Sequence, residues 1–399
     1  MFKDIRIILI FNVILLDIIG IGIIFPIIPD LLSEVGIGKN ASAALWGGLL
    51  SSSYAFMQFA FSPTIGTLSD IFGRRPILLL ASLLLALDYL VMGFAETIWI
   101  LFIGRIIGGL AGGTIATGTA YLADISSAKD KKKNFAIIGA AFGLGFILGP
   151  VIGGLMGEIS IRAPFFLSAL LSLLNFFLCL FLLPETLGFR TKKNFSIRSL
   201  NPLLNISNIF KIRLFKGLFF CFFLIALSNT VYPAIWSFWG REVFGWSSGM
   251  IGFTLACYGV LLFIVQAFII RLQFFDRLST KNLMSFSLIC GIIALFSFGF
   301  VRFEVFVFAI IPVAALSEMV SPTLKAFLSN EISEMDQGFL QGILNSIVGL
   351  TSIIGPISMS YIFSKGASQE SILYIPGAPF LFAGCLFFVS LIFIRRFLS

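Results

Sequence analysis

Residues 66–76 read Gly-Thr-Leu-Ser-Asp-Ile-Phe-Gly-Arg-Arg-Pro, and long apolar runs flank this stretch on both sides. Gly66 permits close helix approach where the chain leaves the membrane, and Gly73 allows a tight turn. Asp70 can accept hydrogen bonds from nearby backbone N–H groups or from an arginine. Pro76 suits the first turn of a helix. The stretch therefore predicts two helices joined by a short charged turn.

The apolar runs recur along the whole chain of 399 residues. A helix needs about 20 mostly apolar residues to cross a bilayer. We expect twelve spans, at 5–32, 42–68, 77–95, 98–122, 135–157, 163–183, 213–236, 248–270, 282–301, 304–328, 339–363 and 373–394. Composition agrees, because 58% of the residues are hydrophobic and 12% are charged, against about a quarter charged in soluble proteins. The chain is predicted to be an all-α membrane protein rather than a soluble enzyme, a disordered chain or a nucleic-acid binder.

The basic residues predict the orientation of these spans. Of the 27 Lys and Arg residues, 21 fall on the side that carries both termini, five fall on the opposite side, and Arg105 lies inside a span. Cytoplasmic loops carry the excess of Lys and Arg. Both termini and the turn with Arg74 and Arg75 are therefore expected in the cytoplasm. The net charge of +8 follows from this topology and needs no nucleic-acid patch.

A repeat divides the chain into two halves of six spans. Two landmarks recur at an offset of 206 residues, namely Asp70 with Asp276 and Gly149-Pro150 with Gly355-Pro356. We expect an N-terminal six-helix half at 1–183, a cytoplasmic central loop at 184–212 and a C-terminal half at 213–399. Parallel repeats of this kind occur in transporters, with the substrate site between the halves near the midplane.

Four ionisable side chains fall deep inside the predicted spans. They are costly there, so each is a candidate functional residue. Asp17 could load and release a proton or orient substrate, with a structural hydrogen bond as the alternative. Asp88 has the same roles, with pairing inside its own half as the alternative. Arg105 could relay charge, contact an anionic substrate or tie the cytoplasmic gate together, and Glu318 could be the protonatable group of the second half.

Other motifs add to these candidates. Small residues in the fifth span allow backbone-to-backbone helix contact, and its proline imposes a kink; the candidates are Gly145, Gly149, Pro150, Gly153 and Gly154. Uncharged hydrogen bonds to substrate could come from Gln58, Asn229 and Gln266, which could equally satisfy kinked backbone. Trp236 and Trp239 are expected to be membrane-interface anchors.

No metal site or cofactor is expected. The chain has no His, its five Cys residues are scattered, and it contains no nucleotide-binding P-loop. Direct drive by ATP is therefore not expected.

The stretch at 66–76 resembles the signature loop of the major facilitator superfamily, and the fifth span resembles the motif of its proton-coupled exporters. Further stretches are similar to the twelve-helix tetracycline efflux proteins, including Leu16-Asp17-Ile18-Ile19-Gly20-Ile21-Gly22, Tyr54 to Pro63, Leu87-Asp88-Tyr89, Ala163 to Phe166, Phe244-Gly245-Trp246 and Gln337 to Gly342. The resemblance implies two rocking six-helix halves and exchange of a cytoplasmic drug–metal complex for protons. It also implies a cytoplasmic gate made by Gly66, Asp70, Gly73, Arg74 and Arg75, with Asp70 docking near Gly338.

The chain departs from the tetracycline efflux family at positions tied to proton coupling. Leu262 stands where the family has a His, and Gly291 aligns with a family Asp, whereas Glu318 stands where the family has a small residue. The resemblance therefore does not fix tetracycline as the substrate, and the coupling site is expected to have moved.

These observations predict a monomeric, proton-coupled exporter of a small amphipathic drug or metabolite in a bacterial inner membrane. Its expected partners are the substrate, protons and the lipid bilayer. The alternative is a metabolite or siderophore carrier of the same fold, including an importer. A membrane-embedded enzyme would need a convergent catalytic set, which the sequence does not present, and a receptor that binds without transport is the remaining alternative.

Overall fold

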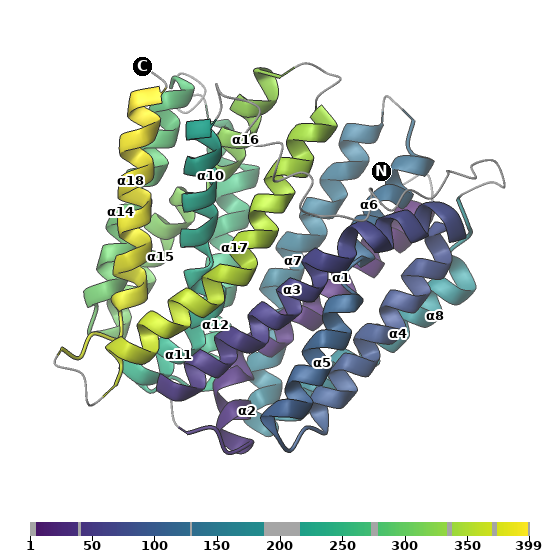
Figure 1. Cartoon of the computed structure of the whole chain (residues 1–399), viewed down its shortest axis with the longest axis horizontal. Helices are drawn as coiled ribbons and strands as arrows, with labels where there is room; N and C mark the ends of the chain where they lie inside the picture. The colour runs from purple at the N-terminus through teal and green to yellow at the C-terminus, as the bar shows by residue number, and fades with distance from the viewer. Residues whose placement is uncertain are drawn as a thin grey trace. The chain divides into compact units, whose positions relative to one another are not determined.

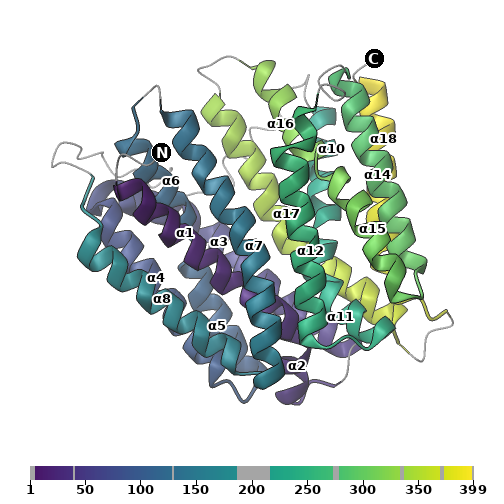
Figure 2. The ribbon, with the colours of Figure 1, turned by 180° about the vertical axis from the view of Figure 1, so that it is seen from behind.

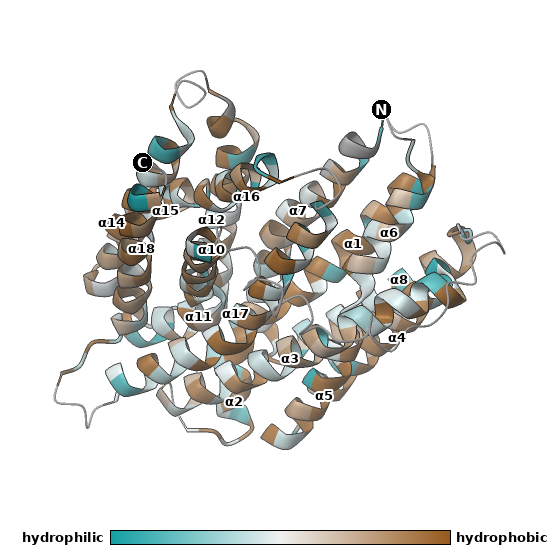
Figure 3. Cartoon of the chain, turned by 45° about the horizontal axis from the view of Figure 1, so that its top comes forward, coloured by the Kyte–Doolittle hydropathy of each residue, from teal (hydrophilic) through white to brown (hydrophobic). Residues whose placement is uncertain are grey.

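The computed structural model describes residues 5–38, 41–127, 130–186, 216–272, 278–332, 337–368 and 373–397. Within these ranges the chain is folded into helices without strands (Figure 1). Figure 3 shows that hydrophobic residues make up most of the helices and that strongly hydrophilic ones are few. This composition is expected of helices that lie in lipid.

The helices follow the predicted spans. In chain order they are α1 (Ile5–Ile24), η1 (Phe25–Ile27), α2 (Ile28–Glu34), α3 (Ala41–Phe72), α4 (Arg74–Gly93), α5 (Ile98–Leu110), α6 (Thr114–Ile125), α7 (Lys131–Ile159), α8 (Ala163–Leu182), α10 (Lys216–Asn229), α11 (Val231–Phe244), α12 (Ser248–Ala267), η4 (Ile269–Arg271), α14 (Thr280–Phe300), α15 (Glu304–Ser317), α16 (Val320–Asn330), α17 (Gln337–Gly366) and α18 (Ala378–Phe397). Eleven described helical segments are long and apolar enough to cross a membrane. The more polar α3, with 32 residues, supplies the twelfth span.

Four of the twelve spans are interrupted by helix breaks. The first span breaks after Ile24 and the seventh after Asn229; the fourth breaks after Leu110 and the tenth after Ser317. The two pairs of break points are separated by 205 and 207 residues, close to the offset of 206 found in the sequence. The interruptions therefore repeat in both halves, which supports the duplication with a backbone feature that the sequence motifs did not include.

The chain forms two compact units. The described residues within Met1–Ile37, Ser53–Pro202 and Ser247–Ala256 make the first, and those within Gly38–Ser52, Leu203–Trp246 and Cys257–Ser399 make the second. Figures 1 and 2 show α10, α14 and α18 side by side in the second unit. Most of the predicted central loop, and Asp276, lie outside the described residues, so the division at 184–212 stays a prediction.

Each unit includes the beginning of one helix whose remainder belongs to the other unit. In the second unit, the start of α3 packs on α17, where Ser52 Oγ donates a 2.6 Å hydrogen bond to the Ile353 carbonyl and Gly48 lies against Pro356. In the first unit, the start of α12 packs on α7, where Gly252 lies against the Pro150 carbonyl. Both contacts are made at the prolines of the repeated Gly-Pro pairs. The repeat thus places equivalent helix-docking points in each unit.

The core of the second unit contains a cluster of aromatic rings. Trp236 and Trp239 are 4% and 1% exposed, and their rings pack edge-on against Phe298. The prediction of membrane-interface anchors is therefore wrong for both tryptophans. Interface anchors need an exposed ring with a wet polar end, whereas these rings fill space between α11, α14 and α18.

Candidate functional site

An ion pair lies inside the first unit between α4 and α5. The Arg105 guanidinium donates to Asp88 Oδ2 at 2.7 Å, and the two side chains are 14% and 0% exposed. The guanidinium also lies 5.3 Å from the centre of the Tyr54 ring on α3, a favourable cation–π geometry. Gly108 makes room for the pair, because an added Cβ would overlap the Asp88 carboxylate. The structure thus brings together two of the four predicted intramembrane charges.

The other oxygen of Asp88 has no partner. Asp88 Oδ1 and Arg105 Nε are both buried without a hydrogen bond. A buried polar atom that lacks a partner carries a substantial desolvation cost. The pair is therefore held by a single close contact and is easier to separate than a pair with every polar atom satisfied.

Asp17 lies in α1, apart from this pair, and its partner is an amide. Asn175 Nδ2 on α8 donates to Asp17 Oδ1 at 2.8 Å and to the Val13 carbonyl at 3.0 Å. Asp17 Oδ2 and Asn175 Oδ1 are buried with no hydrogen-bond partner. A proton on the Asp17 carboxyl would add a donor to a cluster that is short of donors. The arrangement suits a group that holds a proton.

Glu318 lies in the second unit at the break between α15 and α16. Its Oε1 accepts a 2.8 Å hydrogen bond from the hydroxyl of Tyr258 on α12. The ring of Tyr258 is stacked on that of Tyr232, with centroids 5.5 Å apart. All three side chains are half-buried. Glu318 is thus an acid in an aromatic environment, and sequence reasoning gave no sign of either tyrosine.

The charged turn at 66–76 carries a network of polar contacts around Arg74. Arg74 Nη1 lies 2.6 Å from Asp70 Oδ1 and donates to Ser69 Oγ at 2.6 Å, while Nε lies 3.1 Å from Asp124 Oδ2 on α6. Arg75 donates instead to main-chain carbonyls near the end of α8. The two arginines were expected to act together in one gate. In the structure Arg74 ties the turn to α6, and Arg75 ties it to α8.

Glu185 caps the helix that follows this turn. Its carboxylate oxygens accept the backbone N–H groups of Arg74 and Arg75, both at 3.0 Å. The first N–H groups of a helix lack intrahelical partners and favour a negative charge. Gly73 has a φ of +105°, and an added Cβ there would overlap the Glu185 carboxylate. The expected need for glycine at the turn is confirmed. A side chain at this position would also displace the carboxylate of Glu185 that caps the helix.

Gly66 does not have the role that the sequence suggested. An added Cβ there would meet no described atom within 4 Å. The expected close helix approach at Gly66 is therefore absent. Its carbonyl accepts a 2.8 Å hydrogen bond from Ser69 Oγ, which any residue at this position could do.

The small residues of α7 make the predicted backbone contacts with two helices. Gly145, Gly149 and Gly153 lie against α1, where a Cβ on Gly149 would come within 2.8 Å of the Gly22 Cα. Gly154 lies against the start of α12, with its Cβ position 2.6 Å from the Ser248 carbonyl. Pro150 lies inside the helix between these two contact faces. One stripe of small residues thus fixes α7 against both neighbours.

The three uncharged candidates lie in different environments. Gln58 Nε2 donates to the Gly112 carbonyl at 3.3 Å, at the break between α5 and α6, so it satisfies interrupted backbone as the alternative interpretation suggested. Asn229 is the half-buried last residue of α10. Gln266 is exposed in the last turn of α12. Gln58 belongs to the first unit, whereas Asn229 and Gln266 belong to the second.

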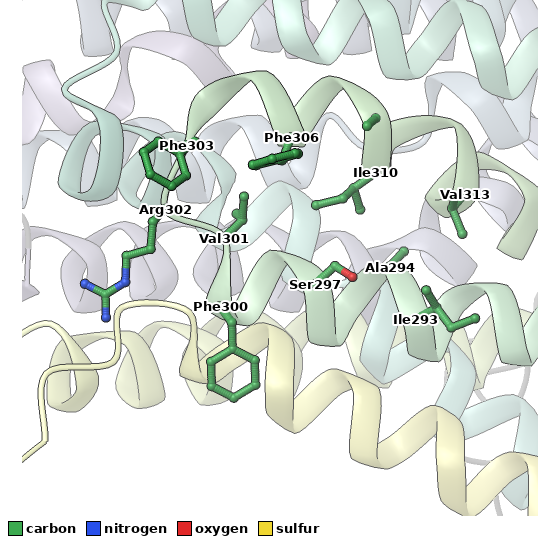
Figure 4. Close-up of a pocket in the computed structure, with 11 residues that line it drawn as sticks. Ile293, Ala294, Ser297, Phe300, Val301, Arg302, Phe303, Phe306, Ile310 and Val313 are labelled. Carbon is green, nitrogen blue, oxygen red and sulfur yellow. The ribbon is translucent and has the colours of Figure 1, made fainter.

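A groove of roughly 520 Å³ lies between α14 and α15. Figure 4 shows Ser297 and Arg302 among mainly apolar side chains. Phe300, Phe303 and Phe306 are 64%, 70% and 58% exposed. Because these rings are exposed, the groove is an apolar feature of the helix surface. None of the predicted site residues lines it.

Comparison with known proteins places these features in a family. The family model of the Major Facilitator Superfamily matches residues 10–272 and 218–398. The chain belongs to the major facilitator superfamily. It is therefore a membrane transporter of this superfamily with the twelve-helix fold.

Among similar members of the superfamily is the tetracycline resistance protein, class C, of Escherichia coli, which is 35% identical over 380 residues, 95% of each chain. Multidrug resistance protein 2 of Bacillus subtilis is 27% identical over 98% of this chain and 94% of the relative. The solved human organic anion transporter MFSD10 has a TM-score of 0.72 at 22% identity, covering 98% of both chains. A solved nucleoside transporter has a TM-score of 0.80 at 16% identity, covering 99% of both chains. The two solved structures support the fold alone.

The position aligned with the acid of the tetracycline efflux members is closed in this superfamily member. A Cβ on Gly291 would overlap the ring of Phe387, and Ser317 lies 3.0 Å from the same point. An aspartate at this position would have to displace a buried ring. The packing therefore agrees with the absence of the acid at position 291.

Sequence reasoning missed four residues that complete the sites, namely Asn175, Asp124, Glu185 and Tyr258. Each reaches its partner from a helix or loop distant in the sequence, with separations from 50 to 158 residues. A polar residue inside an apolar span was the available signal for Asn175. No local pattern distinguishes Glu185 or Asp124, because both are near helix ends where charges are common.

Proposed function

We propose that the chain is a proton-coupled exporter of a small amphipathic drug, working by alternating access in a bacterial inner membrane. The similarity to the tetracycline and multidrug resistance proteins over at least 95% of this chain supports export of drugs. The buried Asp17–Asn175 cluster carries the proposal of proton coupling. Both termini are proposed to lie in the cytoplasm, and the working unit is proposed to be a monomer without a resident cofactor.

Asp17 is the proposed proton carrier. Its partner Asn175 is neutral, so loading a proton on Asp17 changes the charge of the cluster instead of replacing a cation. Two states of the transporter that expose Asp17 to different sides would then differ in its protonation. A few kcal/mol of differential stabilisation moves such an equilibrium by orders of magnitude.

Asp88 and Arg105 are proposed to respond to this change as a switchable pair. A proton on Asp88 would release Arg105 from its 2.7 Å contact and leave it over the Tyr54 ring. Arg105 would then be available to an anionic group of the substrate. The network of Asp70, Arg74 and Asp124 is proposed to stabilise one state at the cytoplasmic ends of the same helices, with Gly66, Gly73 and Arg75 completing the turn.

The α7 stripe is proposed to serve the exchange of substrate for protons. Gly145, Gly149, Pro150 and Gly153 pack closely along α1, and Gly154 packs on the start of α12. Protons and substrate would then have to pass through the alternating cavity instead of leaking beside α7. Gln58, Asn229 and Gln266 remain proposed polar contacts of that cavity.

The experiment uses everted membrane vesicles from cells that express the chain. With an acid interior, uptake of a panel of drugs that includes tetracycline is measured with and without the ionophore nigericin. We expect uptake of at least one amphipathic drug, its loss with nigericin, and proton release from the vesicles on drug addition. Uptake that is indifferent to nigericin would refute proton coupling.

The variant Asp17→Asn tests the proposed carrier. It should abolish gradient-driven uptake but retain counterflow, the exchange of labelled for unlabelled drug without a gradient, because counterflow needs no proton transfer. Glu96→Gln is a matched control because it also replaces a carboxylate with an amide, at an exposed position of the same unit. Gradient-driven uptake by Asp17→Asn at the unmodified rate would exclude Asp17 as the carrier.

An importer of a metabolite is the alternative function. Solved relatives of the same fold include a D-xylose–proton symporter, but at 19% identity this likeness concerns the fold alone. Right-side-out vesicles test it, because a symporter would accumulate its substrate there under an inward proton gradient.

A further inference from the structure

We propose that Glu318, with Tyr258 and Tyr232, forms a binding site for the positively charged group of an organic cation. This inference rests on the proposed export function and names the class of substrate, a lipophilic monocation. Three steps carry it, namely the different compensation of the buried acids, the aromatic surroundings of Glu318 and the helix break that positions it.

The three intramembrane acids are compensated in different ways. Asp88 is paired with Arg105, and Asp17 is enclosed at 2% exposure beside an amide. Glu318 is half-buried, and its one hydrogen bond comes from a phenol. No ion pair to Glu318 occurs in the part of the chain that the structure describes. Glu318 is therefore the acid that a cationic ligand could reach and neutralise.

The groups around Glu318 suit an organic cation. The stacked rings of Tyr258 and Tyr232 continue into the cluster of Trp236, Phe298 and Phe380. Aromatic faces attract a cation through the ring quadrupole, and they also offer apolar area to its substituents. A metal ion would instead require several oxygen ligands, and the described residues contain no cluster of three acids, cysteines or histidines. The chemistry thus favours a bulky cation with aromatic or alkyl groups.

The helix break deprives one backbone oxygen at Glu318 of its usual helical partner. Glu318 lies just after α15 ends and just before α16 begins. Pro322 cannot donate the hydrogen bond that the Glu318 carbonyl would receive in a continuous helix. Interrupted membrane helices place carbonyls and helix ends at transporter binding sites. Val265, Ala315 and Met319 pack together and hold the break against α12.

The repeat supplies an internal comparison. The equivalent break in the first half reads Ala111-Gly112-Gly113, and an offset of 206 places Gly112 at Glu318. The Gly112 carbonyl is satisfied by the neutral amide of Gln58. The backbone at the first-half break is therefore hydrogen-bonded without an acid nearby. The carboxylate of Glu318 is not needed for the break itself, and recognition of a cation explains its presence.

The test is equilibrium binding to the purified full-length chain in detergent, with no proton gradient present. The probes are tetraphenylphosphonium and tetraphenylborate, which have the same shape and opposite charge. The unmodified chain should bind the phosphonium at least about tenfold more tightly than the borate. Equal affinity for the two ions would overturn the proposal without need of any variant.

Variants then locate the charge. Glu318→Gln should weaken phosphonium binding by about tenfold to a hundredfold, the range for loss of a charged contact, and should leave borate binding equal or tighter. Tyr232→Leu should weaken phosphonium binding by about threefold. Glu304→Gln is the matched control, because it removes an acid from the same helix and retains an acceptor for Trp246. Phosphonium binding by Glu318→Gln as tight as in the control would overturn the proposal.

The binding result and the transport result can fail separately. Binding of the phosphonium through Glu318 without gradient-driven uptake of any drug would refute the proposed exporter and keep the cation site. Uptake that depends on the gradient, with phosphonium binding indifferent to Glu318, would keep the exporter and refute the cation site.

Discussion

The two single mutations that break the Asp88–Arg105 pair should lower the stability of the protein by unequal amounts. In Arg105→Gln, the Asp88 carboxyl keeps 0% exposure and loses the only contact of its Oδ2, while Oδ1 already lacks one. Removing one partner of a buried ion pair costs about 3–5 kcal/mol. The lost contact with the Tyr54 ring adds about 1 kcal/mol. We therefore expect Arg105→Gln to lower the free energy of unfolding by about 4 kcal/mol or more.

Asp88→Asn should be milder. Arg105 is 14% exposed and keeps its place over the Tyr54 ring, so we expect a loss of about 1–2 kcal/mol. The double variant Asp88→Asn/Arg105→Gln leaves two neutral amides that can bond one another. It should recover about 2–3 kcal/mol relative to Arg105→Gln, and the double-mutant cycle isolates this interaction.

The buried cysteines of the chain allow thermal unfolding to be measured with a thiol-reactive dye. Cys179, Cys221 and Cys290 are free and buried, so a thiol-reactive dye reports thermal unfolding. We expect the melting temperature of Arg105→Gln to fall by roughly 5–10 °C, with partial recovery in the double variant. Equal melting of Arg105→Gln and the unmodified chain would refute the reasoning, and so would a double variant less stable than either single one.

Three further changes test the packing. Glu185→Ala removes the acceptor for the first two N–H groups of α4, so it should destabilise that turn by about 1–2 kcal/mol and speed its hydrogen exchange; unchanged exchange would contradict the cap. Gly153→Val would drive a side chain into the backbone of α1 and should lower the melting temperature, whereas Gly139→Val, where a Cβ meets no described atom within 4 Å, should not. Gly291→Asp should be poorly tolerated alone and improved by Phe387→Ala, which thermal unfolding of both variants would measure; equal stability of the two would count against the steric explanation.

The arrangement of spans was accessible from the sequence because bilayer thickness fixes the length of an apolar helix. The helix breaks were less accessible. Ala111-Gly112-Gly113 is a strong local signal, since adjacent glycines weaken a helix, whereas Glu318 is separated from Pro322 by three residues and gives a weaker one. The break in the second half depends on packing against α12 as well as on its own residues.

The candidate sites were accessible in part, for a related physical reason. A charge in an apolar span is visible because it is costly, so Asp17, Asp88, Arg105 and Glu318 stand out in the sequence. The partner that compensates each charge is fixed by tertiary structure, and only a charged partner stands out equally. Asp88 and Arg105 could therefore be linked, whereas the amide of Asn175 and the phenol of Tyr258 could not. The tryptophans were misplaced because position along a span does not indicate which face of the helix is buried.

The way each acid is compensated also limits what it can exchange. A carboxylate that is paired with arginine can gain a proton only by releasing a cation, so Asp88 exchanges one charge for another. Asp17 has a neutral partner and is enclosed, so only a species as small as a proton can neutralise it. Glu318 is half-buried and stands beside rings that attract cations. In the proposed mechanism the three acids therefore divide among a switch, a proton site and a substrate site, and this division requires no His in the chain and no acid at position 291.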